Sequence, residues 1–219
     1  MKRPYITLKF AQTLDGRIAA RDGSSRWISG PKSLRFAHRL RSVNDAVLVG
    51  IRTVIADNPS LTVRLVRGKN PTRIIIDGKL RIPLTARLVK DANRVKTIIV
   101  TTHDASARKK EILRKKGVEF IVLPALKDGN IDLKEIIRIL YKKDIKKILV
   151  EGGSRIITSF LKAGLADEVV MILSPKILGR GVETVGDLGI RNIKGALKLR
   201  LKDIKRLGED IICIACASK

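Results

Sequence analysis

The stretch NDAVLVGIRTVIADNPSLTVR, residues 44–64, holds the pattern from which the fold can be predicted. Its apolar run at residues 46–49 is short, rich in β-branched side chains and followed by Gly50, which is typical of a buried strand. Gly50 permits a tight turn or a close backbone approach. Residues 51–56 predict a short helix that ends before Pro59, because proline biases the preceding residue away from helical geometry. A strand, a glycine and a helix N-terminus are the usual frame for a phosphate or a dinucleotide.

Strands and helices alternate through the rest of the chain. The apolar patterns predict strands at residues 5–10, 73–77, 97–101, 118–122, 147–150 and 167–173, and helices at residues 105–116, 132–143 and 154–163, the last ending at Gly164. This alternation predicts an α/β fold with a mostly parallel central sheet flanked by helices. Two final strands around the turn at residues 207–210 predict an antiparallel C-terminal edge. Because no linker or shift in composition interrupts the chain, we expect a single domain over residues 1–219.

The segment between the first strand and the next helix is long and polar. Residues 12–30 predict a loop of the length that tends to carry function. The helix after it begins at Pro31, a residue favoured in the first turn. Its spacing predicts an inner face of Leu34, Ala37 and His38, and an outer face with Arg35 and Arg39.

The net charge of +25 is the strongest feature of the composition. Nucleic-acid binding is the first class that it suggests. Aromatic residues make up only 3% of the chain, however, and no helix-turn-helix or zinc-finger pattern is present. We therefore expect a solvated basic surface that attracts phosphorylated ligands and no nucleic-acid partner. With no apolar run long enough for a bilayer and no signal-peptide pattern, we expect no membrane partner and a cytoplasmic location.

Two cysteines, Cys213 and Cys216, form a C-x-x-C pair near the C-terminus. Such a pair can be half of a zinc site or a redox centre. A structural zinc site needs four ligands, and the only histidines, His38 and His103, are remote in sequence. We interpret both cysteines as residues of a terminal strand and expect no metal site.

A second candidate site follows the predicted strand at residues 147–150. Glu151 stands where that strand ends, and a carboxylate there faces the usual ligand crevice of a parallel sheet. Gly152 and Gly153 let backbone amides face a ligand, and Ser154 opens a helix whose N-terminus adds further donors. A glycine pair after a strand is common in ordinary turns, so this pattern alone leaves both interpretations open.

Four blocks carry a resemblance to a known family. They are GIRTVIADNPSLTVR, LKFAQTLDGRIAARDGSSRWISG, RIIIDGKLRIPLTARL and ILVEGGSRIITSFLKAGLADEVVMILSPKILG. In content and order they resemble the pyrimidine reductase domain of riboflavin biosynthesis, a relative of dihydrofolate reductase, over roughly residues 4–207. The resemblance implies a dihydrofolate-reductase-like fold.

The resemblance also implies roles for individual residues. The implied catalytic residues are Lys9 and Glu151, and the implied substrate contacts are Ser25, Arg41, Leu61, Arg64 and Glu151. The implied cofactor contacts are Ala11, Trp27, Thr53, Asp57, Gly78, Gly153, Ser154, Arg155 and Ile156. Taken singly, several have ordinary explanations: core packing for Trp27 and Leu61, surface exposure for the two arginines, and a helix-terminal carboxylate for Asp57.

The activity that the resemblance implies is an NADPH-dependent reduction, with NADH also possible as cofactor. The substrate would be a ribosylaminopyrimidine 5′-phosphate, whose ribosyl group becomes a ribitylamino group, and a homodimer is expected. Because the deaminase pattern H-x-E…P-C-x-x-C is absent, the chain resembles the stand-alone reductases, and the 2,5-diaminopyrimidinone is favoured over the uracil. A dihydrofolate-type reductase and a basic nucleic-acid-binding protein stay open as alternatives.

Overall fold

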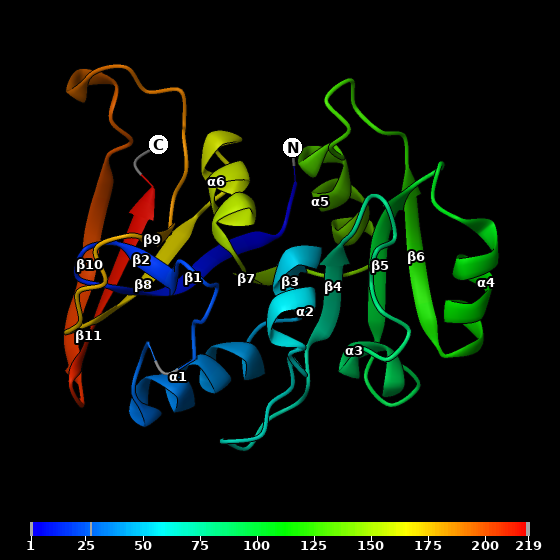
Figure 1. Cartoon of the computed structure of the whole chain (residues 1–219), viewed down its shortest axis with the longest axis horizontal. Helices are drawn as coiled ribbons and strands as arrows, with labels where there is room; N and C mark the ends of the chain where they lie inside the picture. Colours follow the sequence, from blue (N-terminus) through cyan, green and yellow to red (C-terminus); the bar gives the residue numbers. More distant parts are fainter. Residues whose placement is uncertain (1, 27, 218–219) are drawn as a thin grey trace.

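One twisted sheet runs through the computed structural model, which describes residues 2–26 and 28–217 (Figure 1). Its strands are β1 (Tyr5–Thr13), β3 (Ala46–Gly50), β4 (Thr72–Ile76), β5 (Thr97–Thr102), β6 (Val118–Leu123), β7 (Lys147–Glu151), β8 (Glu168–Ser174), β10 (Leu199–Leu207) and β11 (Asp210–Ala217). Within the described residues they lie in the order β10-β11-β8-β1-β7-β3-β4-β5-β6.

The sheet is parallel from β8 to β6, and its C-terminal edge is antiparallel. β1 pairs in parallel with both β7 and β8, and β3 pairs in parallel with β7 and β4. β11 runs antiparallel to β8 and to β10, around a turn where Gly208 has a φ of +71°. The α/β fold predicted from the sequence, with its antiparallel C-terminal edge, is confirmed.

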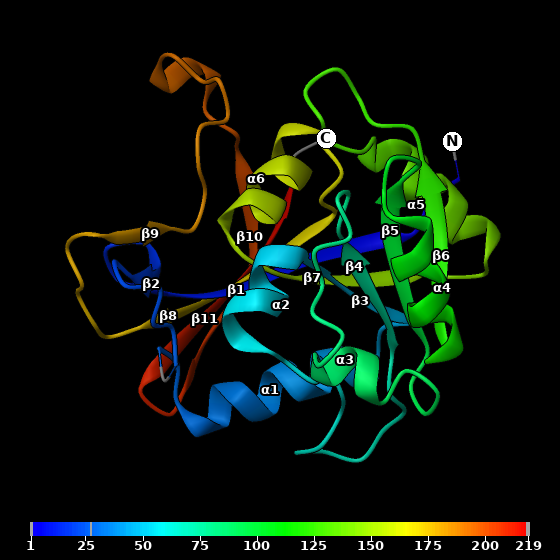
Figure 2. The same ribbon diagram turned by 45° about the vertical axis from the view of Figure 1, so that its right-hand side comes forward.

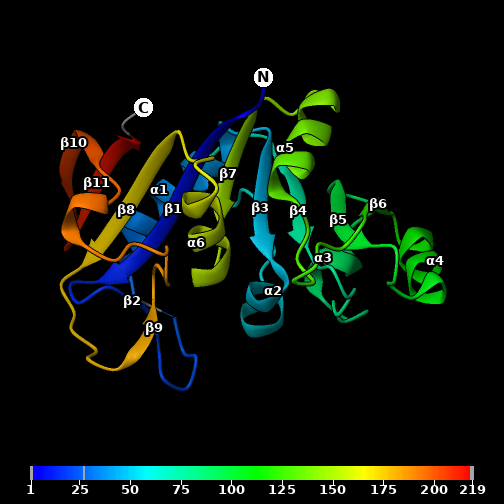
Figure 3. The same cartoon turned by 90° about the horizontal axis from the view of Figure 1, so that it is seen from above.

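Helices cover both faces of the sheet (Figure 3). They are α1 (Pro31–Ser42), α2 (Ile51–Asp57), α3 (Arg87–Lys90), α4 (Ala107–Lys115), α5 (Leu133–Lys142) and α6 (Ser154–Lys162). α5 and α6 bury Ile137 and Phe160 against one face, in the same cluster as Ile6. On the other face, the sheet packs against Leu88 of α3 and Leu113 of α4. Because both faces are covered, the central strands are mostly apolar, as in β3 and β5.

The helix α1 begins at Pro31 as predicted, and its inner face is the predicted one except at Leu34. Ala37 and His38 are buried, whereas Leu34 is 41% exposed. The reason is that α1 turns Phe36 and Leu40 toward the sheet cluster that contains Val170 and Ile172. At 3.6 residues per turn, Leu34 then points away from the sheet.

The loop predicted over residues 12–30 contains more regular structure than expected. β1 extends to Thr13, and a short strand β2 (Arg17–Ala20) pairs with β9 (Gly181–Glu183) in a second sheet beside β1 (Figure 2). The sequence analysis also missed α3 and the 3₁₀ turn η1 (Ile193–Gly195). All of these elements are too short for hydrophobic periodicity to show.

The two cysteines lie in β11, as interpreted from the sequence. Cys213 and Cys216 are both free thiols. Their odd spacing along a strand directs them to opposite faces of the sheet. Over the described ranges, no group of three or more His, Cys, Asp or Glu side chains is arranged to hold a metal ion. Nor does the described part of the chain contain a helix with the length and apolar character needed to cross a bilayer.

Candidate functional site

Lys9 and Glu151 face each other where β7 ends. They are partners in the parallel register of β1 and β7. The Lys9 Nζ atom lies 3.9 Å from Glu151 Oε2, and the two side chains are only 14% and 11% exposed. Because Leu8 and Val150 point into the core under α6, their neighbours Lys9 and Glu151 point to the opposite face, which α1 covers.

Arg41 of α1 binds the Glu151 carboxylate with two parallel hydrogen bonds. Its Nε donates to Oε1 at 2.6 Å, and its Nη2 donates to Oε2 at 2.8 Å. A third donor, Nη1, bonds the backbone oxygen of Thr62 at 3.2 Å. This bidentate geometry fixes the plane of the carboxylate, and one N–H on each of Nη1 and Nη2 has no acceptor among the described residues.

The two cations set the charge state of the site. Burial pushes the pKa of the Glu151 carboxyl upward, but the charges of Arg41 and Lys9 and the hydrogen bonds from Arg41 outweigh burial and lower this pKa to about 2. Burial lowers the pKa of the Lys9 ammonium, with Glu151 opposing the shift. The site therefore holds an ionised carboxylate beside a lysine that gives up its proton more readily than a surface lysine.

Arg64 lies beside Arg41 on the segment that follows α2. Its Nη1 donates to Thr62 Oγ1 at 2.7 Å, and its backbone N–H donates to His38 Nδ1 at 2.9 Å. Burial and the charge of Arg41 lower the pKa of the Arg64 guanidinium. Among the described residues Arg64 has no acidic partner within ion-pair distance, and its side chain is exposed. Two neighbouring guanidinium groups of this kind suit an anion.

The glycine loop after β7 contacts α2. The Gly153 N–H donates to Thr53 Oγ1 at 3.1 Å. Gly153 also caps α6 without a side-chain hydrogen bond, and in the described part of the chain the N–H groups of Ser154 and Arg155 have no protein acceptor. A Cβ at Gly153 would meet only Thr53 Oγ1, at 3.5 Å, so the loop is open at this point. Unpaired amides at the N-terminus of a helix form the donor set that a pyrophosphate requires.

Two segments of the chain approach each other closely where β3 meets α6. A Cβ at Gly50 would lie 2.7 Å from Cγ1 of Ile156. Gly50 has a φ of −86°, so the glycine is required by this contact and not by a left-handed turn. The contact packs Ile156, a predicted cofactor residue, against the start of α2.

Ser25 and Asp57 come together at the far end of α2. The Ser25 hydroxyl donates to Asp57 Oδ1 at 3.4 Å. Burial raises the pKa of the Asp57 carboxyl, and Ser25 and Arg26 oppose that shift. Thr53 lies one turn earlier on the same helix, so α2 connects this pair to the glycine loop. Trp27 lies outside the described residues.

Ala11, Leu61 and Gly78, the other predicted site residues, lie in different parts of the sheet and its core. Ala11 shares the Lys9 face of β1 and packs in the cluster that contains Phe36. Leu61 is 3% exposed and belongs to the core cluster under α2. Its position fits core packing, the alternative given for it in the sequence analysis. Gly78 follows β4, and its carbonyl oxygen accepts from Thr101 and Thr102. Since β3 separates β4 from β7, Gly78 stands apart from the glycine loop.

Two residues of this region were missed by the sequence analysis as members of the site. His38 accepts the Arg64 backbone N–H, and Thr62 accepts from both arginines. His38 had a detectable signal, because it lies three residues before Arg41 and so shares its helix face. Thr62 had no such signal, apart from its position two residues before Arg64 in the block GIRTVIADNPSLTVR.

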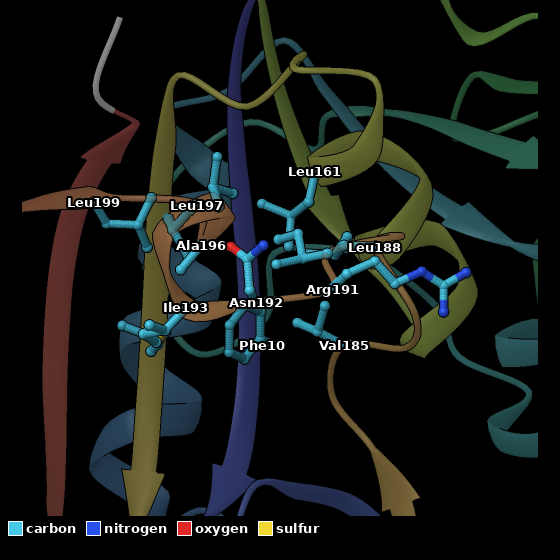
Figure 4. A pocket seen from close by; sticks show the side chains of 13 residues that line it. Phe10, Leu161, Val185, Leu188, Arg191, Asn192, Ile193, Ala196, Leu197 and Leu199 are labelled. Carbon is cyan, nitrogen blue, oxygen red and sulfur yellow. The ribbon is translucent and has the colours of Figure 1, made fainter.

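An apolar cavity of about 490 Å³ lies elsewhere, against the opposite face of β1 (Figure 4). Its lining includes Phe10, Leu161, Met171 and Leu197. Phe10 follows Lys9 directly and therefore points to the other side of the sheet. The cavity is consequently separate from the Lys9, Arg41 and Glu151 cluster.

Comparison with known proteins identifies the family of this chain. Residues 4–213 match the model of the RibD C-terminal domain. The riboflavin biosynthesis protein RibD of Aquifex aeolicus is 46% identical over 96% of this chain and 57% of its own length. The 2,5-diamino-6-ribosylamino-4(3H)-pyrimidinone 5′-phosphate reductase of Methanothermobacter thermautotrophicus is 40% identical over 96% of both chains. The chain thus spans little more than half of the RibD relative but nearly all of the reductase.

Solved structures show the same fold. RibD of Acinetobacter baumannii superimposes with a TM-score of 0.85 at 28% identity, over 100% of this chain and 59% of that chain. A dihydrofolate reductase of Enterococcus faecalis superimposes with a TM-score of 0.53 at 14% identity, over 98% of this chain and 97% of that chain, which shows a shared fold alone. The predicted dihydrofolate-reductase-like fold is confirmed, and with the family match over nearly its whole length the chain belongs to the RibD C-terminal domain family.

Proposed function

We propose that this chain is a nicotinamide-dependent reductase of riboflavin biosynthesis, which converts the ribosyl group of a ribosylaminopyrimidine 5′-phosphate to the ribitylamino form. The observation that carries the proposal is the buried cluster of Lys9, Arg41 and Glu151 directly before a glycine loop with unpaired amides. The similarity to the Methanothermobacter reductase over nearly all of both chains supports the same activity.

NADPH is the proposed cofactor. The N–H groups of Ser154 and Arg155 and the open space at Gly153 suit its pyrophosphate, and Thr53 holds the loop in place. When bound, a reduced nicotinamide supplies a hydride. The preference for NADPH over NADH rests on the family resemblance. Ala11, Trp27, Asp57, Gly78 and Ile156 remain predicted contacts of the cofactor.

Reduction of the sugar requires a proton as well as a hydride. The bond between the anomeric carbon and the ring oxygen breaks, that oxygen takes one proton, and the nitrogen lone pair forms a carbon–nitrogen double bond. The anomeric carbon then accepts the hydride and the double-bond electrons return to nitrogen. Lys9 suits the proton donor, because burial lowers its pKa. Glu151 stays ionised and therefore only accepts hydrogen bonds, which orients sugar hydroxyls.

The phosphate and the pyrimidine define the substrate. The Arg64 guanidinium forms no ion pair with a described acid. Together with the N–H groups of Arg41 that have no described acceptor, it suits a phosphate dianion. Ser25 is a further proposed phosphate or ribose contact, and Leu61 a proposed wall of the pocket. We favour the 2,5-diaminopyrimidinone as substrate over the uracil, in line with the name of the Methanothermobacter relative.

Turnover of both pyrimidine phosphates with each nicotinamide cofactor tests the proposal. Loss of the reduced-nicotinamide absorbance should be fastest with the diaminopyrimidinone and NADPH, and the product should be the ribitylamino compound by mass spectrometry. Reduction of dihydrofolate instead, or no turnover of either pyrimidine, would overturn it.

Assembly, domain organisation and location complete the proposal. We propose one domain over residues 1–219, since the main sheet takes strands from both ends of the described chain. A homodimer is proposed because β10, a nine-residue edge strand, exposes 58% of Leu201 and 57% of Ile204. A cytoplasmic location fits a biosynthetic enzyme. Sedimentation equilibrium and cell fractionation test the last two points, and a monomer at micromolar concentration would exclude the homodimer.

A further inference from the structure

His38 is a buried histidine with an acceptor role. It lies on α1 with 1% of its surface exposed. Its Nδ1 accepts the backbone N–H of Arg64 at 2.9 Å and approaches that of Leu65 at 3.4 Å. Because a backbone N–H can only donate, Nδ1 must carry a lone pair, and the proton of the neutral ring sits on Nε2.

The surroundings of His38 favour that neutral ring. Burial and the charges of Arg41, Arg64 and Lys9 lower the pKa of its imidazole to about 4, against a smaller opposing effect of Glu151. At neutral pH the ring is therefore a permanent acceptor for the segment at residues 62–65, which we call the Arg64 segment.

Two neighbouring residues of α1 hold the Arg64 segment from the same helix face. His38 binds the backbone of Arg64, and Arg41, three residues later, binds the backbone oxygen of Thr62. Arg41 also holds Glu151. One helix face thus connects the segment that carries Arg64 to the carboxylate of the site.

We propose that His38 is a positioning residue for the substrate phosphate: its Nδ1 lone pair fixes the backbone of the Arg64 segment so that the Arg64 and Arg41 guanidinium groups face one anion. This inference rests on the proposed function, in which Arg64 and Arg41 bind the phosphate. It predicts that loss of the acceptor weakens phosphate binding while the glycine loop, which is held by the Thr53 hydroxyl of α2, keeps its affinity for the cofactor.

Two matched variants test the inference. His38→Leu removes the acceptor and keeps an apolar side chain, whereas His38→Asn places Oδ1 close to the position of Nδ1 and restores it. We expect His38→Leu to raise the KM for the phosphorylated pyrimidine about tenfold, the scale of one lost hydrogen bond. The KM for NADPH should stay unchanged, and His38→Asn should recover most of the loss.

A purely structural role for His38 gives a different pattern. The melting temperature would fall in both variants, with no change in KM for the phosphorylated substrate or with equal changes for substrate and cofactor. Either result, or an asparagine variant as impaired as the leucine variant, would overturn the inference.

Binding of ribose 5-phosphate separates this inference from the proposed activity. Isothermal titration should show that wild-type protein binds this probe, that His38→Leu binds it about tenfold more weakly, and that Arg64→Ala matches the leucine variant. That result would support His38 even if no pyrimidine were reduced, and equal affinity in wild type and His38→Leu would refute it. If the leucine variant does not fold, ¹⁵N NMR of the wild type decides, since a proton on Nδ1 of His38 contradicts the proposal.

Discussion

Glu151 shows how a single carboxylate depends on its neighbours. It is buried and would be neutral in an apolar site, yet Arg41 and Lys9 keep it ionised. An ionised carboxylate accepts hydrogen bonds from sugar hydroxyls but cannot supply the proton that ring opening needs. The division of labour between Lys9 and Glu151 therefore follows from their charge states.

We expect Glu151→Gln to lower kcat/KM at least about tenfold, because roughly 1.4 kcal/mol of lost transition-state stabilisation is one decade in rate. The variant keeps the shape of the side chain but ends the ion pairs with Lys9 and Arg41. Steady-state kinetics should show the loss, with NADPH affinity nearly unchanged. Normal turnover, or loss of NADPH binding instead, would remove Glu151 from the substrate role.

We expect Arg64→Ala to weaken binding of the phosphorylated substrate, because a charge-assisted contact on the order of 1.5–3 kcal/mol is lost. The dephosphorylated analogue should be affected far less. Arg67→Ala, on the exposed side of the same loop, is the matched control and should leave kcat/KM unchanged. Equal losses of Arg64→Ala on both substrates would show that Arg64 does not bind the phosphate.

His38 makes folding stability depend on pH. Burial, with the charges of Arg41 and Arg64, lowers its folded pKa to about 4, whereas an unfolded histidine titrates near 6.5. Between these values the unfolded chain binds the extra proton, so stability is complete above the unfolded pKa and falls as pH decreases toward 4. We expect urea unfolding to show a loss of up to about 1.4 kcal/mol per pH unit from this group, and His38→Asn to reduce that slope. An unchanged slope in the variant would assign the pH dependence to other groups.

At this scale the sequence predicted some contacts and missed others. The resemblance to the family predicted Glu151 and Lys9 as site residues, and the register of β1 and β7 brings the two side chains together. Arg73 was interpreted only as the start of a core strand, yet it is fully buried and donates to Thr97 Oγ1 and Asp91 Oδ1. No pattern around Arg73 shows this, because the acceptors come from residues that only tertiary structure brings near.

The site lies where the ends of several strands and helices meet. The carboxyl end of β7, the N-terminus of α6 and the N-terminus of α2 meet at Gly50, Gly153 and Ile156. The long apolar strands behind these ends were predictable, because a continuous β-branched run is typical of a parallel sheet. The short β2, β9 and α3 were not, since elements of three or four residues carry too little periodicity.

We expect Gly153→Val to fold but to weaken NADPH binding. A Cβ at Gly153 would have Thr53 Oγ1, at 3.5 Å, as its one neighbour within 4 Å among the described residues, and the φ of −67° at Gly153 is ordinary, so the backbone is not strained. The added side chain would instead occupy the space in front of the unpaired amides of α6. Fluorescence titration with NADPH measures the effect, and circular dichroism checks the fold. A folded variant with an unchanged dissociation constant would exclude the glycine loop from the cofactor site.

The whole molecule carries a net charge of +25, and this charge has a physical consequence beyond the site. Its lysines and arginines are scattered, as on the exposed face of α4. We expect weak DNA binding at low salt that disappears steeply as salt is raised, without sequence preference, because counterion release drives such binding. Fluorescence anisotropy with two unrelated duplexes checks this. Tight binding to one of them at physiological salt would revive the nucleic-acid alternative.

The strand order also governs how the protein is made. β1 is synthesised early, but its two partners in the described part of the sheet, β7 and β8, belong to the last third of the chain, whereas β3, β4, β5 and β6 can pair in the order of translation. The emerging polypeptide therefore carries an unpaired apolar strand, with Ile6 and Leu8 unburied, until residues 147–174 leave the ribosome. Such long-range pairing is slow and exposes the chain to aggregation. Chaperone capture and off-pathway association during biosynthesis should accordingly concentrate on β1.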